Sequence, residues 1–212
     1  PDQAGSAVAL IGVGGDELAP LEIDLTMDGP GFVIAGPPRS GRSSALITVA
    51  RSLSARGGRL LVVAPRRSPV TDLADVPGVL GVLGRGATAA DLADATATAA
   101  AEGQPLVVIA DDAELLADAP LADALADFVK DARDTGNALV AAGTTEDLQS
   151  AYRGFTVDAR RSRCGVLLCP ASPLEGDLFT VRLPRSTVGA TLPGRGLLAV
   201  RGQLTPIQVA LS

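Results

Sequence analysis

The stretch FVIAGPPRSGRS, residues 32–43, decides the fold. Its first four residues are apolar and predict a buried strand over Phe32–Ala35. The glycine-rich loop that follows leads into a helix, which we expect to begin near Arg42 and to end at about Arg56, before a pair of glycines. A strand that turns through such a loop directly into a helix is typical of α/β proteins with a parallel sheet.

The loop matches the phosphate-binding pattern G-x-x-x-x-G-K-[ST] at every fixed position except the lysine, which is Arg42 here. Its glycines would let successive backbone N–H groups wrap around an anion, and the helix N-terminus adds about half a positive charge. We therefore expect nucleotide phosphates to bind Gly36, Pro37, Pro38, Arg39, Ser40, Gly41, Arg42, Ser43 and Ser44. The Ser43 hydroxyl would bind Mg²⁺. A glycine-rich strand-to-helix turn without a ligand is the alternative.

The rest of the chain predicts strands that alternate with helices, hence a mainly parallel sheet covered on both faces, with short terminal β-hairpins. Expected strands cover Val8–Ile11, Leu21–Leu25, Phe32–Ala35, Leu60–Ala64, Val79–Leu83, Leu106–Ala110, Ala138–Ala142, Val166–Leu168, Gly196–Val200 and Leu204–Val209. Expected helices cover Arg42–Arg56, Thr88–Glu102, Pro120–Arg133 and Glu146–Arg153. The first two strands would form a hairpin that turns at Gly14-Gly15-Asp16.

A second element supports nucleotide binding independently. The apolar strand Leu106–Ala110 ends in Asp111-Asp112, and carboxylates at the end of a parallel strand face the ligand crevice of such sheets. Asp111 would anchor Mg²⁺ through water, and Asp112 stands where an active ATPase has a water-polarising glutamate. Asp112 would equally serve as the N-cap of the following turn. The Leu60–Ala64 strand is expected to separate the loop strand from the acidic strand in sequence but not in space.

Thr144 follows the next strand and would sense the terminal phosphate, with a helix cap as its alternative role. Arg42 is the sharpest departure from an active site. A guanidinium group is planar and bulkier than an ammonium group and binds phosphate in a fork, so binding would survive while turnover falls. Together with Asp112 in place of glutamate, this predicts weak or absent hydrolysis and leaves open whether the chain is an enzyme.

Composition limits the chemistry further. The chain has no histidine, which excludes histidine general bases, Ser-His-Asp triads and histidine metal ligands. The net charge of −6 argues against a DNA-binding surface. Arg153, Arg160, Arg161 and Arg163 form a basic cluster that would either reach a neighbouring subunit's phosphates, bind a protein carboxylate or be a solvated face. Cys164 and Cys169 would be buried thiols on opposite strand faces in a reducing compartment.

Length and hydropathy complete the description. A chain of 212 residues fits one domain over 1–212, and no apolar run approaches the roughly 20 residues of a membrane span. The start at Pro1, without methionine, suggests a piece excised from a longer protein.

The chain resembles the FtsK/SpoIIIE-type ATPases, and especially the tandem ATPase modules of the type VII secretion motor family EccC/EssC and its actinobacterial relatives. The similar segments, besides the loop, are IG at 11–12, DELAP at 16–20, IDL at 23–25, VIADD at 108–112, DARR at 158–161, SPLEGDL at 172–178 and LPGRGLL at 192–198. The preference for arginine over lysine and for alanine is typical of a high-GC actinobacterial genome.

This resemblance implies a RecA-like fold, ATP and Mg²⁺ as ligands, and sister ATPase modules of the same chain in a ring or hexamer. It also implies helical secreted proteins as substrates and a cytoplasmic location on a protein anchored in the cytoplasmic membrane by segments outside this piece. Downstream modules of such motors often carry degenerate loops, which Arg42 and Asp112 fit. The alternatives are a non-catalytic module that docks substrates and a DNA translocase module.

Overall fold

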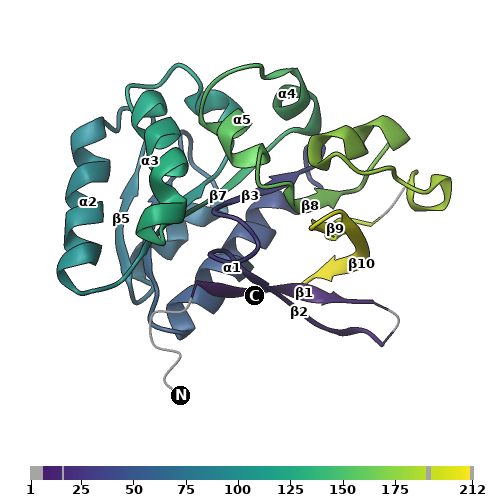
Figure 1. The fold of residues 1–212 in the computed structure, drawn as a ribbon, viewed down its shortest axis with the longest axis horizontal. Coiled ribbons are helices and arrows are strands. Elements are labelled where there is room, and N and C mark those ends of the chain that lie inside the picture. The colour runs from purple at the N-terminus through teal and green to yellow at the C-terminus, as the bar shows by residue number, and fades with distance from the viewer. Residues whose placement is uncertain (1–6, 16, 190–191, 211–212) are drawn as a thin grey trace.

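A computed structural model describes residues 7–15, 17–189 and 192–210, whose strands form one ten-stranded sheet (Figure 1). The strands are β1 (Val8–Gly14), β2 (Ala19–Asp24), β3 (Gly31–Ala35), β4 (Arg59–Val63), β5 (Val79–Leu83), β6 (Leu106–Ala110), β7 (Ala138–Gly143), β8 (Cys164–Leu168), β9 (Arg195–Val200) and β10 (Gln203–Val209). They lie in the order β2-β1-β10-β9-β8-β3-β7-β6-β4-β5.

The six strands from β8 to β5 are all parallel, as the continuous apolar runs predict. The expectation about β4 is confirmed, because β4 pairs with β6 on the side away from β3 and so does not separate the two strands in space. It is β7, which follows β6 in sequence, that pairs with both β3 and β6 and lies between them. A crossover helix can carry the chain past a strand position that a later strand then fills, so order in sequence does not give order in the sheet.

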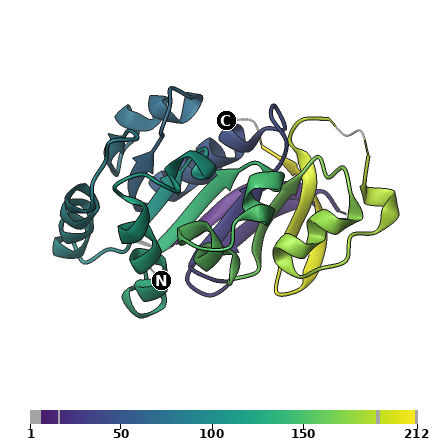
Figure 2. The same ribbon diagram turned by 90° about the horizontal axis from the view of Figure 1, so that it is seen from above.

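Helices cover both faces of this parallel sheet (Figure 2). The helices are α1 (Arg42–Ala55), α2 (Ala89–Ala101), α3 (Ala122–Thr135), α4 (Thr145–Ser150) and α5 (Phe155–Arg160), with 3₁₀ segments η1 (Pro69–Asp75), η2 (Ala113–Leu116), η3 (Pro173–Phe179) and η4 (Arg185–Thr187). α1 and η1 pack on one face, and α2 to α5 pack with η3 on the other.

Strand β3 illustrates why both faces are apolar. Successive side chains of a strand point to opposite faces, so Val33 and Ala35 pack under α2 to α5 while Phe32 and Ile34 pack under α1. All four side chains are fully buried. A strand in this position needs apolar residues without polar alternation, and this is the pattern that the sequence has.

The terminal strands form two antiparallel hairpins, β1–β2 and β9–β10, as predicted. They join each other through β1 and β10 and extend the sheet beyond β8, so they are part of the sheet and not separate additions. Asp16 of the predicted turn lies outside the described residues. Within the described part of the chain, no helix is long and apolar enough to cross a bilayer.

The two cysteines lie at opposite ends of β8. Cys164 is buried at its start, as predicted, and burial raises the pKa of its thiol to about 12. Cys169, which directly follows the strand, is only half-buried. The Cys164 thiol is therefore protonated and unreactive at neutral pH.

Candidate nucleotide site

The loop between β3 and α1 has the geometry that its glycines predict. Gly41 adopts a φ of 101°, in the left-handed region that favours glycine, at the N-terminal boundary of α1. A Cβ atom at Gly36 would lie 2.5 Å from the Ser40 hydroxyl and 3.0 Å from the Leu168 carbonyl oxygen, so a side chain there would force its neighbours to shift. The Gly36 N–H group donates to the carbonyl of Gly143 (3.3 Å), which fastens the start of the loop to the end of β7.

The segment before β9 packs directly on this loop. The Gly194 N–H group donates to the Ser40 carbonyl (2.7 Å), and a Cβ atom at Gly41 would lie 3.1 Å from the Gly194 nitrogen. The absence of a side chain at Gly41 thus allows the close approach of the two backbones. Sequence reasoning did not assign this role to Gly194, although the surrounding LPGRGLL segment was noted.

Arg42 turns back into its own loop. Its side chain is 9% exposed, Nη1 donates to the Gly36 carbonyl (2.7 Å), and Nη2 pairs with Asp112 Oδ1 (3.3 Å). The guanidinium group therefore joins the start of the loop to the acidic strand. A buried charge with two partners is held firmly, because each partner would otherwise be left unsatisfied.

The predicted metal-binding residues meet as expected at the ends of α1 and β6. Ser43 Oγ donates to Asp111 Oδ2 (3.0 Å), and Asp111 is 1% exposed. Ser68 also donates to Asp111 Oδ2 (2.8 Å), and sequence reasoning missed this residue. Hydroxyl and carboxylate oxygens are the hard donors that Mg²⁺ prefers, so the residues present fit that ion.

Asp112 is enclosed by two arginines. Besides the pair with Arg42, its carboxylate accepts two hydrogen bonds from Arg66, at 2.5 Å from Nε and 2.8 Å from Nη2. These bonds and the negative charge of Asp112 raise the pKa of Arg66. Asp112 flanks η2 with a φ of 45°, but its side chain makes no capping bond. Asp112 thus occupies the predicted N-cap position, while its side chain binds the two arginines instead of capping; its catalytic role remains a prediction.

The structure places Thr144 at the N-cap of α4, its alternative role. Its hydroxyl accepts from the Asp147 N–H group (3.1 Å) and donates to the Asp147 carboxylate. The sensing role remains a prediction. The neighbouring Thr145 has a buried hydroxyl without a hydrogen-bond partner among the described residues, and the same holds for Ser40 Oγ and Glu114 Oε2. Burial raises the pKa of Glu114, whose Oε2 lies 2.7 Å from the place that a Cβ atom of Gly143 would take.

A hollow of about 600 Å³ lies between the loop and the segment after β4. Its charged and hydroxyl-bearing lining residues are Arg39, Arg42, Arg66, Arg67, Ser43, Ser44, Ser68 and Asp112. Four arginines thus face one carboxylate, in a chain with a net charge of −6. Such a concentration of guanidinium groups favours a ligand with several negative charges. Pro38 lines this hollow, and Pro37 lines a second one on the other side of the loop, beside Thr144.

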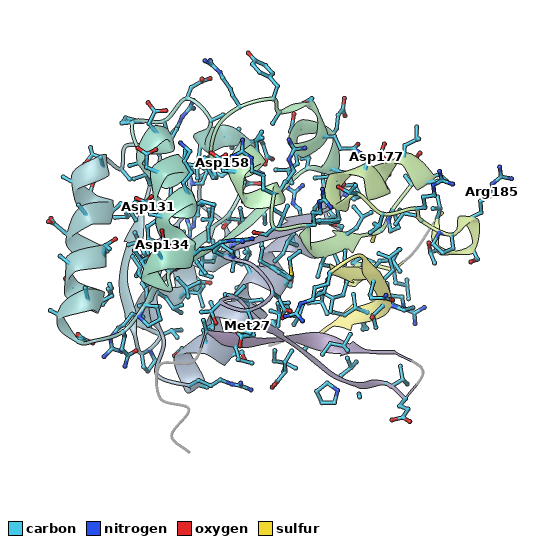
Figure 3. The ribbon with its side chains drawn as sticks, in the orientation of Figure 1. Met27, Asp131, Asp134, Asp158, Asp177 and Arg185 are labelled. Atoms are coloured by element: carbon cyan, nitrogen blue, oxygen red, sulfur yellow. The ribbon has the colours of Figure 1, made fainter. Side chains whose placement is uncertain are left out.

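Three arginines of the predicted basic cluster each contact a residue that is near in sequence. Arg160 donates to the Ala151 carbonyl (2.7 Å), and Arg161 pairs with Asp158 (2.9 Å). Asp158 lies on α5, which packs beside α3 (Figure 3). Arg153 lies over the ring of Tyr152, 5.9 Å from its centroid. These contacts fit the solvated-face alternative better than a group of free arginines.

No family model and no curated protein sequence matches the chain, whereas solved structures do. The chain is similar over 100% of its length to the cytoplasmic domain of the type VII secretion ATPase EccC of Thermomonospora curvata, with 22% identity and a TM-score of 0.76, and it covers 27% of that chain. A structure of ATPases 2 and 3 of the same protein, in complex with a signal sequence peptide, matches over 100% of this chain and 42% of its own, with 23% identity and a TM-score of 0.75.

ATPases 2 and 3 of EssC from Geobacillus thermodenitrificans are also similar, with 17% identity and a TM-score of 0.77 over 97% of this chain and 41% of theirs. The chain thus spans less than half the length of each of these structures. At such identities the likeness establishes the fold alone: this chain has the same RecA-like α/β fold as these EccC and EssC structures, as the resemblance in its sequence implies.

Proposed function

We propose that this chain is an ATP–Mg²⁺-binding module of a type VII secretion-like motor, with weak or absent hydrolysis. The observation that carries the proposal is the state of Asp112, whose carboxylate is bound to Arg42 and Arg66 directly beside a phosphate-binding loop. The loop supports binding, and the two ion pairs argue against turnover.

Phosphate binding rests on the loop and on the cations around it. The inner phosphates would contact the backbone N–H groups of Arg39 and of residues 41–44 at the N-terminus of α1, since Pro37 and Pro38 have no N–H group. Ser43 and Asp111 would hold Mg²⁺, which when bound neutralises charge between two phosphates. The four arginines of the hollow would complement the remaining charge.

Weak hydrolysis follows from the charge environment of Asp112. A carboxylate that polarises water must have an oxygen lone pair free to accept the proton of that water. Guanidinium groups already occupy three of the about four acceptor sites of the Asp112 carboxylate, so its capacity to bind and polarise a water is reduced. The aspartate side chain is also one methylene shorter than glutamate, so it reaches less far into the site.

Titration calorimetry of the chain with ATP and Mg²⁺ tests binding. We expect a saturable signal for the wild type and weaker binding for Ser43→Ala, while Arg185→Ala, an exposed arginine on η4 far from the loop, is the matched control (Figure 3). No signal at millimolar ATP would refute the proposal. A brisk release of phosphate that Asp112→Asn abolishes would refute weak hydrolysis.

The motor context is proposed from the structural neighbours. Two of their names describe numbered ATPases, 2 and 3, and one of these also a complex with a signal sequence peptide. By analogy, this module would sit beside sister modules in a ring or hexamer, act on helical secreted proteins, and belong to a protein anchored in the cytoplasmic membrane through other segments. Double-stranded DNA is a poor alternative because of the net charge of −6.

A substrate-docking module is the second candidate. A hollow of about 690 Å³ lies between α3 and residues 151–156, and its lining includes Ala117, Ala119, Ala122 and Ala126. Small side chains let the backbone of a helical peptide approach closely. Peptide binding that is indifferent to ATP and to Arg42→Ala, but is blocked by Ala122→Glu, would favour this function. Asp134→Ala, on the exposed side of the same helix, is the control (Figure 3).

A further inference from the structure

Two arginines hold Asp112, but they differ in how readily they can leave it. The Arg42 side chain is 9% exposed and also donates to the Gly36 carbonyl, so its departure would leave a buried acceptor without a partner. The Arg66 side chain is 61% exposed, and water can replace its contacts when it moves. Arg66 is therefore the cation of this site that is free to exchange partners.

The position of Arg66 indicates which partner it would take. It follows β4, across the hollow from the loop, and its guanidinium group is bound to the carboxylate that comes directly after the metal-binding Asp111. In P-loop ATPases the residue at the position of Asp112 faces the water that attacks the terminal phosphate. A cation bound to Asp112 thus stands beside the place of that phosphate, whereas the loop itself surrounds the inner ones.

We propose that Arg66 binds the terminal phosphate of a nucleoside triphosphate and leaves Asp112 when that phosphate enters, so that it distinguishes triphosphate from diphosphate. The proposal rests on the proposed function, because it concerns the same site. A guanidinium fork matches phosphate as well as carboxylate, and a terminal phosphate carries more negative charge than Asp112. Arg66 would thereby supply the mobile charge that the buried Arg42 does not.

The exchange has a consequence for Asp112. While Arg66 is bound, both carboxylate oxygens accept charged hydrogen bonds. After Arg66 moves to the phosphate, Asp112 keeps only the 3.3 Å contact from Arg42 to Oδ1, and Oδ2 becomes free. Triphosphate binding would therefore loosen Asp112 where a diphosphate would not, but the remaining ion pair with Arg42 and the short aspartate side chain still argue against fast turnover.

Calorimetric titration of wild type and Arg66→Ala with ADP and with ATPγS, both with Mg²⁺, tests the proposal. We expect Arg66→Ala to weaken ATPγS binding by about 10- to 100-fold, the range for loss of hydrogen bonds between charged groups, and ADP binding by less than about threefold. Arg66→Lys should lie between, because it keeps the charge without the fork. Arg185→Ala, an exposed arginine on η4 outside the hollow, is the control.

The possible results are distinct. Equal loss of affinity for both nucleotides in Arg66→Ala would overturn the proposal and show that Arg66 acts only through its general charge. Unchanged affinity for both would overturn it as well, while the proposed function stands. If the wild type binds neither nucleotide, the proposed function itself fails. An unchanged far-UV circular dichroism spectrum and melting curve for Arg66→Ala would show that its fold is intact.

Discussion

Replacement of Arg42 by alanine should destabilise the protein far more than replacement of Arg66, although both residues pair with Asp112. Arg42→Ala removes a buried ion pair and leaves the Gly36 carbonyl without its 2.7 Å donor. Breaking a buried pair costs about 3–5 kcal/mol, and we expect the lower end because Asp112 keeps Arg66. Arg66→Ala removes a 61% exposed partner and should cost less than about 1 kcal/mol.

Urea denaturation at pH 7, followed by circular dichroism without nucleotide, measures both free energies of unfolding. Arg42→Met separates charge from packing, because it keeps most of the aliphatic stem and loses the hydrogen bonds. We expect it to remain destabilised by about 2 kcal/mol, the value of a hydrogen bond to a charged group. Equal losses for Arg42→Ala and Arg66→Ala would refute the reasoning that burial, and not pairing alone, fixes Arg42 in the loop.

Two further predictions concern the ends of β6 and β7. Glu114→Gln should stabilise the protein at pH 7, because burial raises the pKa of Glu114 in the folded state and makes its ionised form unfavourable there. The gain in the free energy of unfolding should vanish at acidic pH, where the carboxyl is protonated in both the folded and the unfolded state. Denaturation curves at several pH values measure this trend, with the exposed Glu146→Gln as control, and a gain that persists at acidic pH would contradict it. Thr144→Ala should cost about 1 kcal/mol through loss of the α4 cap, whereas Thr144→Ser should cost little, and an equal loss in both would contradict the capping role.

The sequence predicted the elements of the fold well because its signals are local. Apolar runs marked the parallel strands, and the Thr88 and Asp91 pair marked the start of α2, where Asp91 accepts from the Thr88 N–H group. Shorter elements escaped, since the six residues of α5 (Phe155–Arg160) are too few to display helical periodicity. The place of β7 between β3 and β6 also escaped, because strand order depends on packing and not on local pattern.

The residues of the candidate site also divide into those that a local motif predicts and those that only tertiary contacts bring together. The loop, Asp111 and Asp112 were predictable because each lies in a local motif. Arg66 and Ser68 contact these aspartates across more than 40 positions of sequence, and only the pairing of β4 with β6 brings them there. The available signal was weak: a pair of arginines directly after a buried parallel strand, at the sheet edge where ligands bind.

The contacts of Arg66 and Ser68 attach the segment before η1 to the acidic strand. Both residues lie in one short segment between β4 and η1, and they hold it to the acidic strand through Asp112 and Asp111. A terminal phosphate would compete for Arg66, and Mg²⁺ would compete for the Asp111 oxygen that Ser68 contacts. Since the segment leads through η1 to the edge strand β5, ATP–Mg²⁺ would release both of these attachments at once and so change a surface distant from the phosphates.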